Sequence, residues 1–214
     1  MNMWFRCHFL FAGLFVSISA LTPEECLPLV TPLDLANHSM LHDRLNFIVG
    51  YTDTEAFKVI LKSTDSSWAK LSWWPNSNTH AVMHQGNRMN GTCFKSSNNV
   101  TFEDNTGVSV VGDITSTFHL LPTCEGCLVL NVSIVSRNLN KVLQLLKVDS
   151  TVNEEVVTTH SLYLMARNST LSDSDLQHFR QQASCLGFPG EPDFHYDPKN
   201  DFCGEDEGLT LQFV

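Results

Sequence analysis

The chain has 214 residues, of which 43% are hydrophobic and 17% are charged, and it carries 23 acidic and 13 basic side chains for a formal net charge of −10. This length suits one domain. The acidic balance argues against a nucleic acid or an anionic membrane surface as a partner.

The first twenty residues have the layout of a secretory signal peptide. Arg6 precedes an apolar core over residues 8–20, and small residues before Leu21 favour cleavage after Ala20. The apolar run is short for a membrane anchor and lacks a strong basic stop. We therefore expect a leader over 1–20, no membrane span, and a secreted, extracellular domain over 21–214.

Sequons and cysteines support an extracellular location independently of the leader. Five Asn-x-Ser/Thr glycosylation sequons occur, at Asn37, Asn90, Asn99, Asn131 and Asn168. Apart from Cys7 in the leader, six cysteines remain: Cys26, Cys93, Cys124, Cys127, Cys185 and Cys203. An even number predicts three disulfides and no free thiol, although the sequence alone leaves the pairing open.

Cys124 and Cys127 form a C-x-x-C motif, a pattern that redox and zinc sites also use. The motif occurs once, after Pro122 and before an apolar run. This position favours a structural disulfide in a hairpin.

Between residues 43 and 166 the chain breaks into eight short apolar or alternating runs separated by Asn, Gly, Pro and Ser. The runs cover 45–51, 68–74, 81–85, 92–102, 108–121, 128–135, 142–148 and 156–165. Their spacing predicts an antiparallel all-β barrel or sandwich. An immunoglobulin-type sandwich is disfavoured, because the first tryptophan after the leader, Trp68, is far from Cys26. Residues 142–148 fit a strand or a short inserted helix, and residues 55–62 are equally ambiguous.

One helix is predicted over about 173–186. Ser172 can cap its start, Asp175 occupies the capping-box position, and Gly187 follows its end. Its apolar stripe consists of Leu176, Phe179, Ala183 and Leu186. Cys185 lies on the opposite side of the helix, where its sulfur can form a disulfide with another segment. A tail over 187–214 follows the helix.

Strand alternation predicts which side chains face inward. Glycosylated asparagines and charged residues face water. The outward positions of Asn99, Asn131 and Lys70 therefore determine which way the neighbouring side chains on each strand point. His80 and His84 would be roughly 13 Å apart on a strand, too far to share a metal ion, and are read as outward. The predicted ligand-facing residues are Leu71, Trp73, Met83, Gln85, Asn87, Val100, Phe102, Leu130, Val132, Tyr163 and Met165.

No motif for chemistry stands out. The sequence contains no G-x-S-x-G, no H-E-x-x-H and no phosphate-binding glycine loop. We expect a protein without catalytic activity, cofactor or metal. An isomerase on a similar barrel would need a nucleophile such as a free interior thiol.

Several segments carry a family resemblance over almost the whole chain after the leader. They are T-P-E-E-C-L-P-L, N-R-M-N-G-T-C, H-L-L-P-T-C-E-G-C-L-V, L-Y-L-M-A-R, D-S-D-L-Q-H-F-R-Q-Q-A-S-C-L-G-F and Y-D-P-K-N-D-F-C. With them the chain resembles lipocalins of the orosomucoid (alpha-1-acid glycoprotein) type, closest to the fish branch that binds saxitoxin and tetrodotoxin or tributyltin.

The resemblance implies an eight-stranded up-and-down barrel, a C-terminal helix packed outside and a pocket for a small hydrophobic or amphipathic molecule. It also implies the disulfides Cys26–Cys185, Cys93–Cys203 and Cys124–Cys127. The chain departs from the family at the Gly-x-Trp signature, which reads Asp43-Arg44-Leu45 here. Arg167, which matches the family arginine, therefore has no indole from that strand to stack on.

The expected function is reversible binding and transport of a lipid, xenobiotic or toxin by a secreted, glycosylated, monomeric protein. Binding of a guanidinium toxin is the narrower alternative. It is less favoured than binding of a hydrophobic xenobiotic or lipid, because such a toxin would need acidic or polar groups inside and the inward set contains no carboxylate. A second alternative is an immunomodulatory glycoprotein that acts through its surface.

Overall fold

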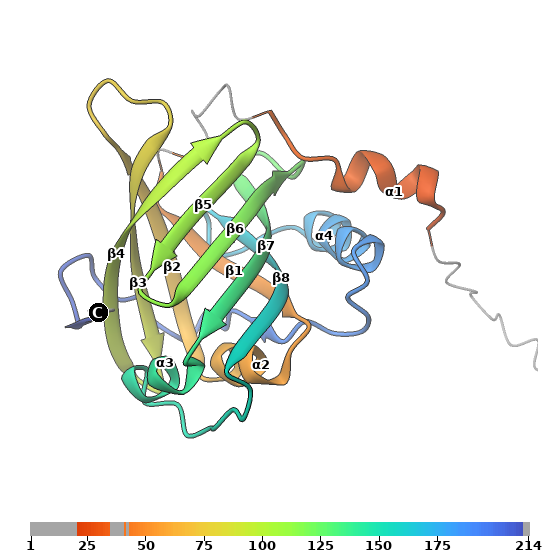
Figure 1. The fold of residues 1–214 in the computed structure, drawn as a ribbon. Helices are drawn as coiled ribbons and strands as arrows, with labels where there is room; N and C mark the ends of the chain where they lie inside the picture. Colours follow the sequence, from red (N-terminus) through yellow and green to blue (C-terminus); the bar gives the residue numbers. More distant parts are fainter. Residues whose placement is uncertain (1–20, 35–40, 42, 212–214) are drawn as a thin grey trace, which may run out of the picture.

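Eight antiparallel strands form a closed barrel in the computed structural model, which describes residues 21–34, 41 and 43–211 (Figure 1). The expected leader and Asn37 lie outside the described residues. The strands are β1 (Leu45–Thr52), β2 (Thr64–Trp73), β3 (His80–Met89), β4 (Thr92–Glu103), β5 (Thr106–Val111), β6 (Ile114–Leu121), β7 (Cys127–Arg137) and β8 (Val156–Ala166). Each pairs with its sequence neighbours, and β1 pairs with β8, which closes the up-and-down barrel.

The predicted number of strands is right, one predicted run is wrong, and the structure decides the two segments that the sequence left open. Residues 108–121 were expected as one strand and form the hairpin of β5 and β6, with Gly112 in the turn at a φ of 55°. Such a turn needs positive φ, which glycine adopts without steric cost. Residues 142–148 fit a strand or a short helix by sequence, and the helical alternative is the correct one for their first part, since helix α3 covers Leu139–Leu145. The other ambiguous segment is helix α2, Glu55–Lys62.

Helix α4 (Asp173–Cys185) packs on the outside of the barrel, as predicted. The Ser172 hydroxyl accepts a hydrogen bond from the Asp175 backbone N–H at 3.2 Å. Phe179 and Ala183 are buried against the outward side chains of β1 and β8. Burial of one large apolar side chain such as Phe179 contributes roughly 1.5–3 kcal/mol.

A helix that was not predicted, α1 (Pro23–Val30), lies beside α4 (Figure 1). Its sequence signal was present: Thr22 and Glu25 form a complete capping box, and proline occupies the first turn. The Cys26–Cys185 disulfide joins α1 to α4. The structure also contains the disulfides Cys93–Cys203 and Cys124–Cys127, so all three pairs are those that the resemblance implied.

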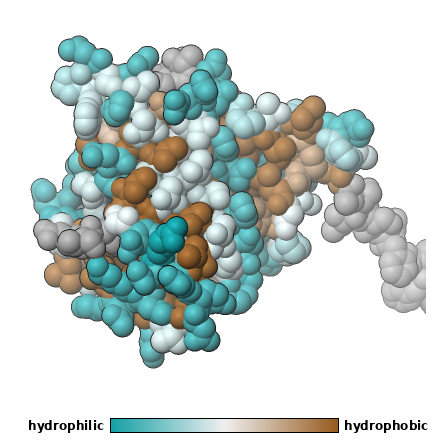
Figure 2. Space-filling view, viewed as in Figure 1, coloured by the Kyte–Doolittle hydropathy of each residue, from teal (hydrophilic) through white to brown (hydrophobic). Residues whose placement is uncertain are grey.

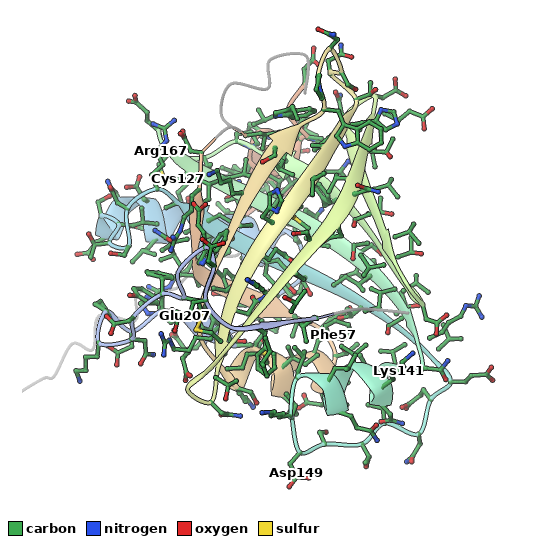
Figure 3. All side chains as sticks on the ribbon, turned by 90° about the vertical axis from the view of Figure 1, so that its left-hand side faces the viewer. Phe57, Cys127, Lys141, Asp149, Arg167 and Glu207 are labelled. Atoms are coloured by element: carbon green, nitrogen blue, oxygen red, sulfur yellow. A yellow bond between two sulfur atoms is a disulfide. The ribbon has the colours of Figure 1, made fainter. Side chains whose placement is uncertain are left out.

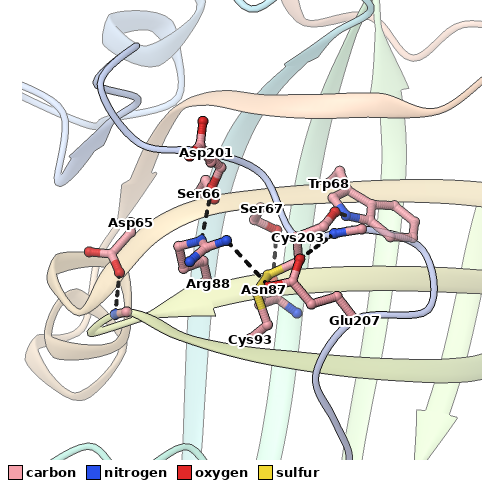
Figure 4. Close-up of a disulfide and its surroundings, with 12 residues drawn as sticks. Asp65, Ser66, Ser67, Trp68, Asn87, Arg88, Cys93, Asp201, Cys203 and Glu207 are labelled. Carbon is pink, nitrogen blue, oxygen red and sulfur yellow. Dashed lines mark hydrogen bonds and ion pairs between the residues drawn. A yellow bond between two sulfur atoms is a disulfide. The ribbon is translucent and has the colours of Figure 1, made fainter.

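The C-terminal tail crosses the outer face of β2 and is bonded along its length (Figure 4). Trp68 donates from Nε1 to the Cys203 carbonyl at 2.8 Å, and Ser66 Oγ donates to the Asp201 carbonyl at 2.8 Å. Cys203 is disulfide-bonded to Cys93 on β4. The tail therefore ties β2 to β4 from outside.

Two short strands of the tail extend the sheet. β9 (Phe194–His195) pairs with β1, and the Phe194 ring stacks on Phe47 at 4.4 Å. β10 (Leu209–Thr210) pairs in parallel with β4. The tail thus supplies backbone and an aromatic ring to the barrel wall.

The two ends of the barrel are closed differently. At the end that carries α2 and α3, an apolar cluster packs together, and Phe57 joins it to the barrel core; Figure 3 shows this end at the lower right, opposite Arg167. The buried members of this cluster are Met89, Phe94, Leu139, Leu143, Val148 and Val157.

At the opposite end, an arginine stacks on an indole. The arginine is not Arg167, however, and the indole does not come from the strand that carries the family signature. Arg44 lies over the ring of Trp68 on β2 at 4.6 Å, and Arg167 forms an ion pair with Asp43 at 2.7 Å. The altered signature is therefore accompanied by a cation–π contact between Arg44 and Trp68. No helix among the described residues is long and apolar enough to cross a membrane.

Candidate ligand site in the barrel interior

All eleven predicted ligand-facing residues point into the barrel. Residues paired across antiparallel strands share one face of the sheet. The register pairs Leu71 with Met83, Trp73 with Ala81 and Leu130 with Tyr163. The apolar members of the predicted set belong to one cluster: Leu71, Trp73, Met83, Val100, Phe102, Leu130, Val132, Tyr163 and Met165. Gln85 and Asn87 follow Met83 on the same face of β3.

The outward assignments agree with the same register. Lys70 reaches Glu205 on the outer tail at 3.4 Å. His84 contacts the hydroxyl of Ser97 at 2.9 Å, and His80 contacts that of Thr79 at 2.9 Å. In the described part of the chain, no group of three or more His, Cys, Asp or Glu side chains could hold a metal ion.

Several inward side chains are not fully covered by their neighbours. Leu71, Met83, Leu130 and Tyr163 face inward from different strands, yet each keeps accessible surface and is only half-buried. Side chains in a solid core would cover one another fully. An eight-stranded barrel is just wide enough to be filled by side chains or to hold one small ligand. The retained surface indicates the second arrangement.

The inner wall carries a small residue in one region and a group of aromatic rings in another. Ala69 lies inward on β2 between Leu45 and Gln85. Toward one end, the Trp73 and Phe102 rings lie 4.9 Å apart and Phe102 meets Phe118 edge-on at 5.9 Å. These rings form an apolar surface at that end of the interior.

Tyr163 brings a hydroxyl into this region. Burial raises the pKa of the Tyr163 phenol, and the hydrogen bond from Ser161 acts in the opposite direction. Its ring meets Phe47 edge-on at 5.2 Å. The phenol therefore stays neutral at physiological pH and can donate or accept a hydrogen bond.

The three tyrosines of the chain are expected to titrate late. Burial raises the pKa of Tyr51, Tyr163 and Tyr196 above the ordinary value of 10.0. Since the folded-state pKa exceeds the unfolded-state value, this contribution to stability is complete below about pH 10 and is lost as the pH rises further. Absorbance at 295 nm should rise at a higher pH in the native protein than in the denatured chain. Titration in denaturant gives the reference, and a normal native titration curve would contradict the placement of the rings.

Sequence reasoning missed a row of small polar side chains on the same inner wall. Ser67 donates to Asn87 Oδ1 at 2.6 Å, Ser96 donates to Gln85 Oε1 at 3.3 Å, and Asn98 donates from Nδ2 to Ser109 Oγ at 2.7 Å. The signal was available, because an outward Asn99 places Asn98 inward. The row is named here the polar stripe: Ser67, Gln85, Asn87, Ser96, Asn98 and Ser109.

Two hollows of the surface lie outside the barrel interior. One, of about 520 Å³, is lined by Arg44, Asn46, Phe202 and residues 167–170, and the other, of about 480 Å³, lies between Asp113 and residues 138–155. Neither includes a predicted ligand-facing residue. Figure 2 shows that apolar residues also appear on the outer surface, including the region of α1, where Leu27 is 65% exposed.

Comparison of the sequence with protein-family models and with curated proteins gives no match. Solved structures do match over most of their length. The siderocalin Ex-FABP is 14% identical, with a TM-score of 0.50 over 81% of this chain and 96% of that one. The odorant-binding protein OBP1 is 14% identical, with a TM-score of 0.53 over 73% of this chain and 90% of that one. The chain has the lipocalin fold.

A dog lipocalin allergen gives a similar result, at 12% identity and a TM-score of 0.50 over 70% of this chain and 88% of that one. Identity at this level shows the fold and nothing finer. The lipocalin fold places the eleven predicted residues on the inner wall of its barrel, and the polar stripe on the same wall.

Proposed function

We propose that this protein binds and carries a small hydrophobic or amphipathic molecule in its barrel interior and performs no catalysis. One observation carries the proposal: inward side chains from several strands keep accessible surface within a closed barrel. Burial of apolar ligand surface there contributes about 25 cal/mol per Å², and Gln85, Asn87 and Tyr163 supply direction. The neighbouring structures support it by their names, since one is an odorant-binding protein and another is described as having dual ligand specificities.

The setting that goes with this function is a secreted glycoprotein. It consists of one domain over 21–214 after cleavage of the leader, acts as a monomer and belongs to the orosomucoid type of lipocalin. The six paired cysteines suit an oxidising compartment. The side chains of Asn90, Asn99 and Asn168 are exposed, as glycan attachment requires.

An uncharged ligand is favoured over a guanidinium toxin. The inward positions of the described strands carry no carboxylate that could pair with a cation. A buried charge without a partner is costly. Toxin binding therefore ranks below the binding of a neutral lipid or xenobiotic.

Titration with the neutral apolar fluorophore N-phenyl-1-naphthylamine tests the function. The probe should brighten and quench tryptophan emission, because Trp73 borders the interior. Trp73→Phe should lose most of the quenching while the probe still binds. Trp74→Phe is the matched control, since Trp74 is 46% exposed and stacks on His80. Absence of both brightening and quenching would disprove the pocket.

A further inference from the structure

The polar stripe runs across four neighbouring strands of the inner wall. The register pairs Ser67 with Asn87, Gln85 with Ser96, and Val100 with Ser109, and Asn98 lies between these last two pairs. Same-face residues on one strand are about 7 Å apart, and neighbouring strands are about 4.8 Å apart. The stripe is therefore a continuous polar band on one side of an otherwise apolar interior.

The stripe contains three amide side chains, and each is hydrogen-bonded to a neighbouring residue through only one of its two polar atoms. Asn87 and Gln85 accept from Ser67 and Ser96, and Asn98 donates to Ser109, whose hydroxyl in turn donates to the Asn99 carbonyl at 3.0 Å. In the part of the chain that the structure describes, no protein group bonds the NH₂ groups of Gln85 and Asn87 or the carbonyl oxygen of Asn98. Which atom is oxygen and which nitrogen follows from the hydrogen bonds, but in either orientation one end of each amide stays open.

These open ends belong to side chains on the inner face of the barrel wall. Gln85, Asn87 and Asn98 are half-buried on the inward face of β3 and β4. Buried polar groups are normally hydrogen-bonded. Two donors and one acceptor at spacings of about 7 Å are a template for a guest with several hydrogen-bonding groups along one edge.

The band carries no charge. The inward residues of β2 to β5 from Ser67 to Ser109 are apolar, hydroxyl or amide side chains. Asp53, which directly follows β1, is not part of this band. Its carboxylate already accepts hydrogen bonds from Thr159 Oγ1 at 2.7 Å and from the His160 N–H at 2.9 Å. Amides satisfy hydroxyl groups well but cannot neutralise an ion.

Resting on the proposed carrier function, we infer that the ligand is an uncharged amphipathic molecule with a polyhydroxylated, sugar-like head against the polar stripe. Its apolar part lies against Leu130, Val132 and Phe118 on the opposite strands, which belong to the apolar cluster. A ring with hydroxyl groups on both sides spans the distance between neighbouring amides. A simple hydrocarbon leaves the open amides without partners, and a fatty acid or an organic cation leaves its own charge without an opposite charge.

Four probes with the same eight-carbon tail distinguish a sugar-like head from a single hydroxyl, an anionic and a cationic head. They are n-octyl-β-D-glucoside, 1-octanol, octanoate and octylamine. Each displaces N-phenyl-1-naphthylamine from the full chain below its micelle concentration. The glucoside should bind about tenfold more tightly than octanol, the equivalent of one or two net hydrogen bonds. Octanoate and octylamine should bind less tightly than the glucoside.

Two variants assign the preference to the stripe. Asn98→Leu and Gln85→Met keep the side-chain size and should reduce the glucoside preference toward one, whereas Ser97→Ala, on the outer face of β4, should leave it unchanged. Asn98→Asp should raise the affinity for octylamine above that of the wild-type chain, which tests the position even if an apolar substitution there does not fold.

The outcomes separate this inference from the carrier function. If the fluorophore binds but octanol competes as well as the glucoside, the sugar-like head is wrong and the carrier function stands. A glucoside preference that survives both Asn98→Leu and Gln85→Met also overturns the inference. If neither the fluorophore nor any octyl compound binds, both proposals fail.

Discussion

Replacement of both Cys93 and Cys203 by alanine should lower the free energy of unfolding by about 4–5 kcal/mol. In the chain-entropy model, a crosslink stabilises by restricting the unfolded chain, and its effect grows with the loop that it closes. This disulfide closes a loop of 110 residues. The loss should be among the largest for any side-chain change outside the barrel, because the bridge holds the tail that covers β2.

The short disulfide provides the control. Cys124 and Cys127 are only 3 positions apart in the sequence, so their double alanine variant should lose about 1.5 kcal/mol. Urea unfolding followed by tryptophan fluorescence measures both losses. The long-loop variant should also show a red-shifted native emission, because Trp68 loses the ordered Cys203 carbonyl. Equal losses in the two variants would contradict the assigned role of the tail.

The facing of the inner wall followed from the sequence because alternation needs only one reliable outward residue per strand. Lys70 determined the facing of the side chains on β2. Asn99 and Asn131 did the same for β4 and β7. The period of a strand is two residues, so each such residue determines every other side chain on that strand. The same rule places Asn98 inward, next to the outward Asn99, so the polar stripe also had a signal in the sequence.

The eight predicted runs equal the eight strands in number, although they differ from the strands at two places. Residues 108–121 hide a turn at Gly112 within a run that looks continuous, and residues 142–148 lie in an apolar stretch whose first part is helical. Periodicity alone does not separate a short buried helix from a strand. In this chain the apolar residues of α3 cover the end of the barrel, and that tertiary role decides their conformation.

The closure of the wall by the tail had no local signal. β9 and β10 have two residues each, too few to show any period. Their positions depend on contacts between residues far apart in sequence, such as Phe194 with Phe47. The stacking of Arg44 on Trp68 is of the same kind, because the ring comes from β2 and not from the strand that carries the family signature.

Substitution of Ala69 by phenylalanine should abolish probe binding with little loss of stability. Ala69 is small, half-buried and inward, next to Leu45 and Gln85. A phenyl ring there would occupy the space that a ligand needs. We expect the affinity for N-phenyl-1-naphthylamine to fall by about a hundredfold or more, equivalent to roughly 2.7 kcal/mol, while the free energy of unfolding changes by less than about 1 kcal/mol.

The two readouts together distinguish a hollow barrel from a solid one. Insertion of a large side chain into a filled core forces neighbours to shift and costs about 1–3 kcal/mol or more; insertion into an empty space does not. Ser72→Phe on the exposed face of the same strand is the matched control and should change neither binding nor stability. A strongly destabilised Ala69→Phe variant would mean that side chains already fill the interior, and the carrier function would then have no site. A stable variant that no longer binds the probe would locate the site beside β2, on the wall that continues into the polar stripe.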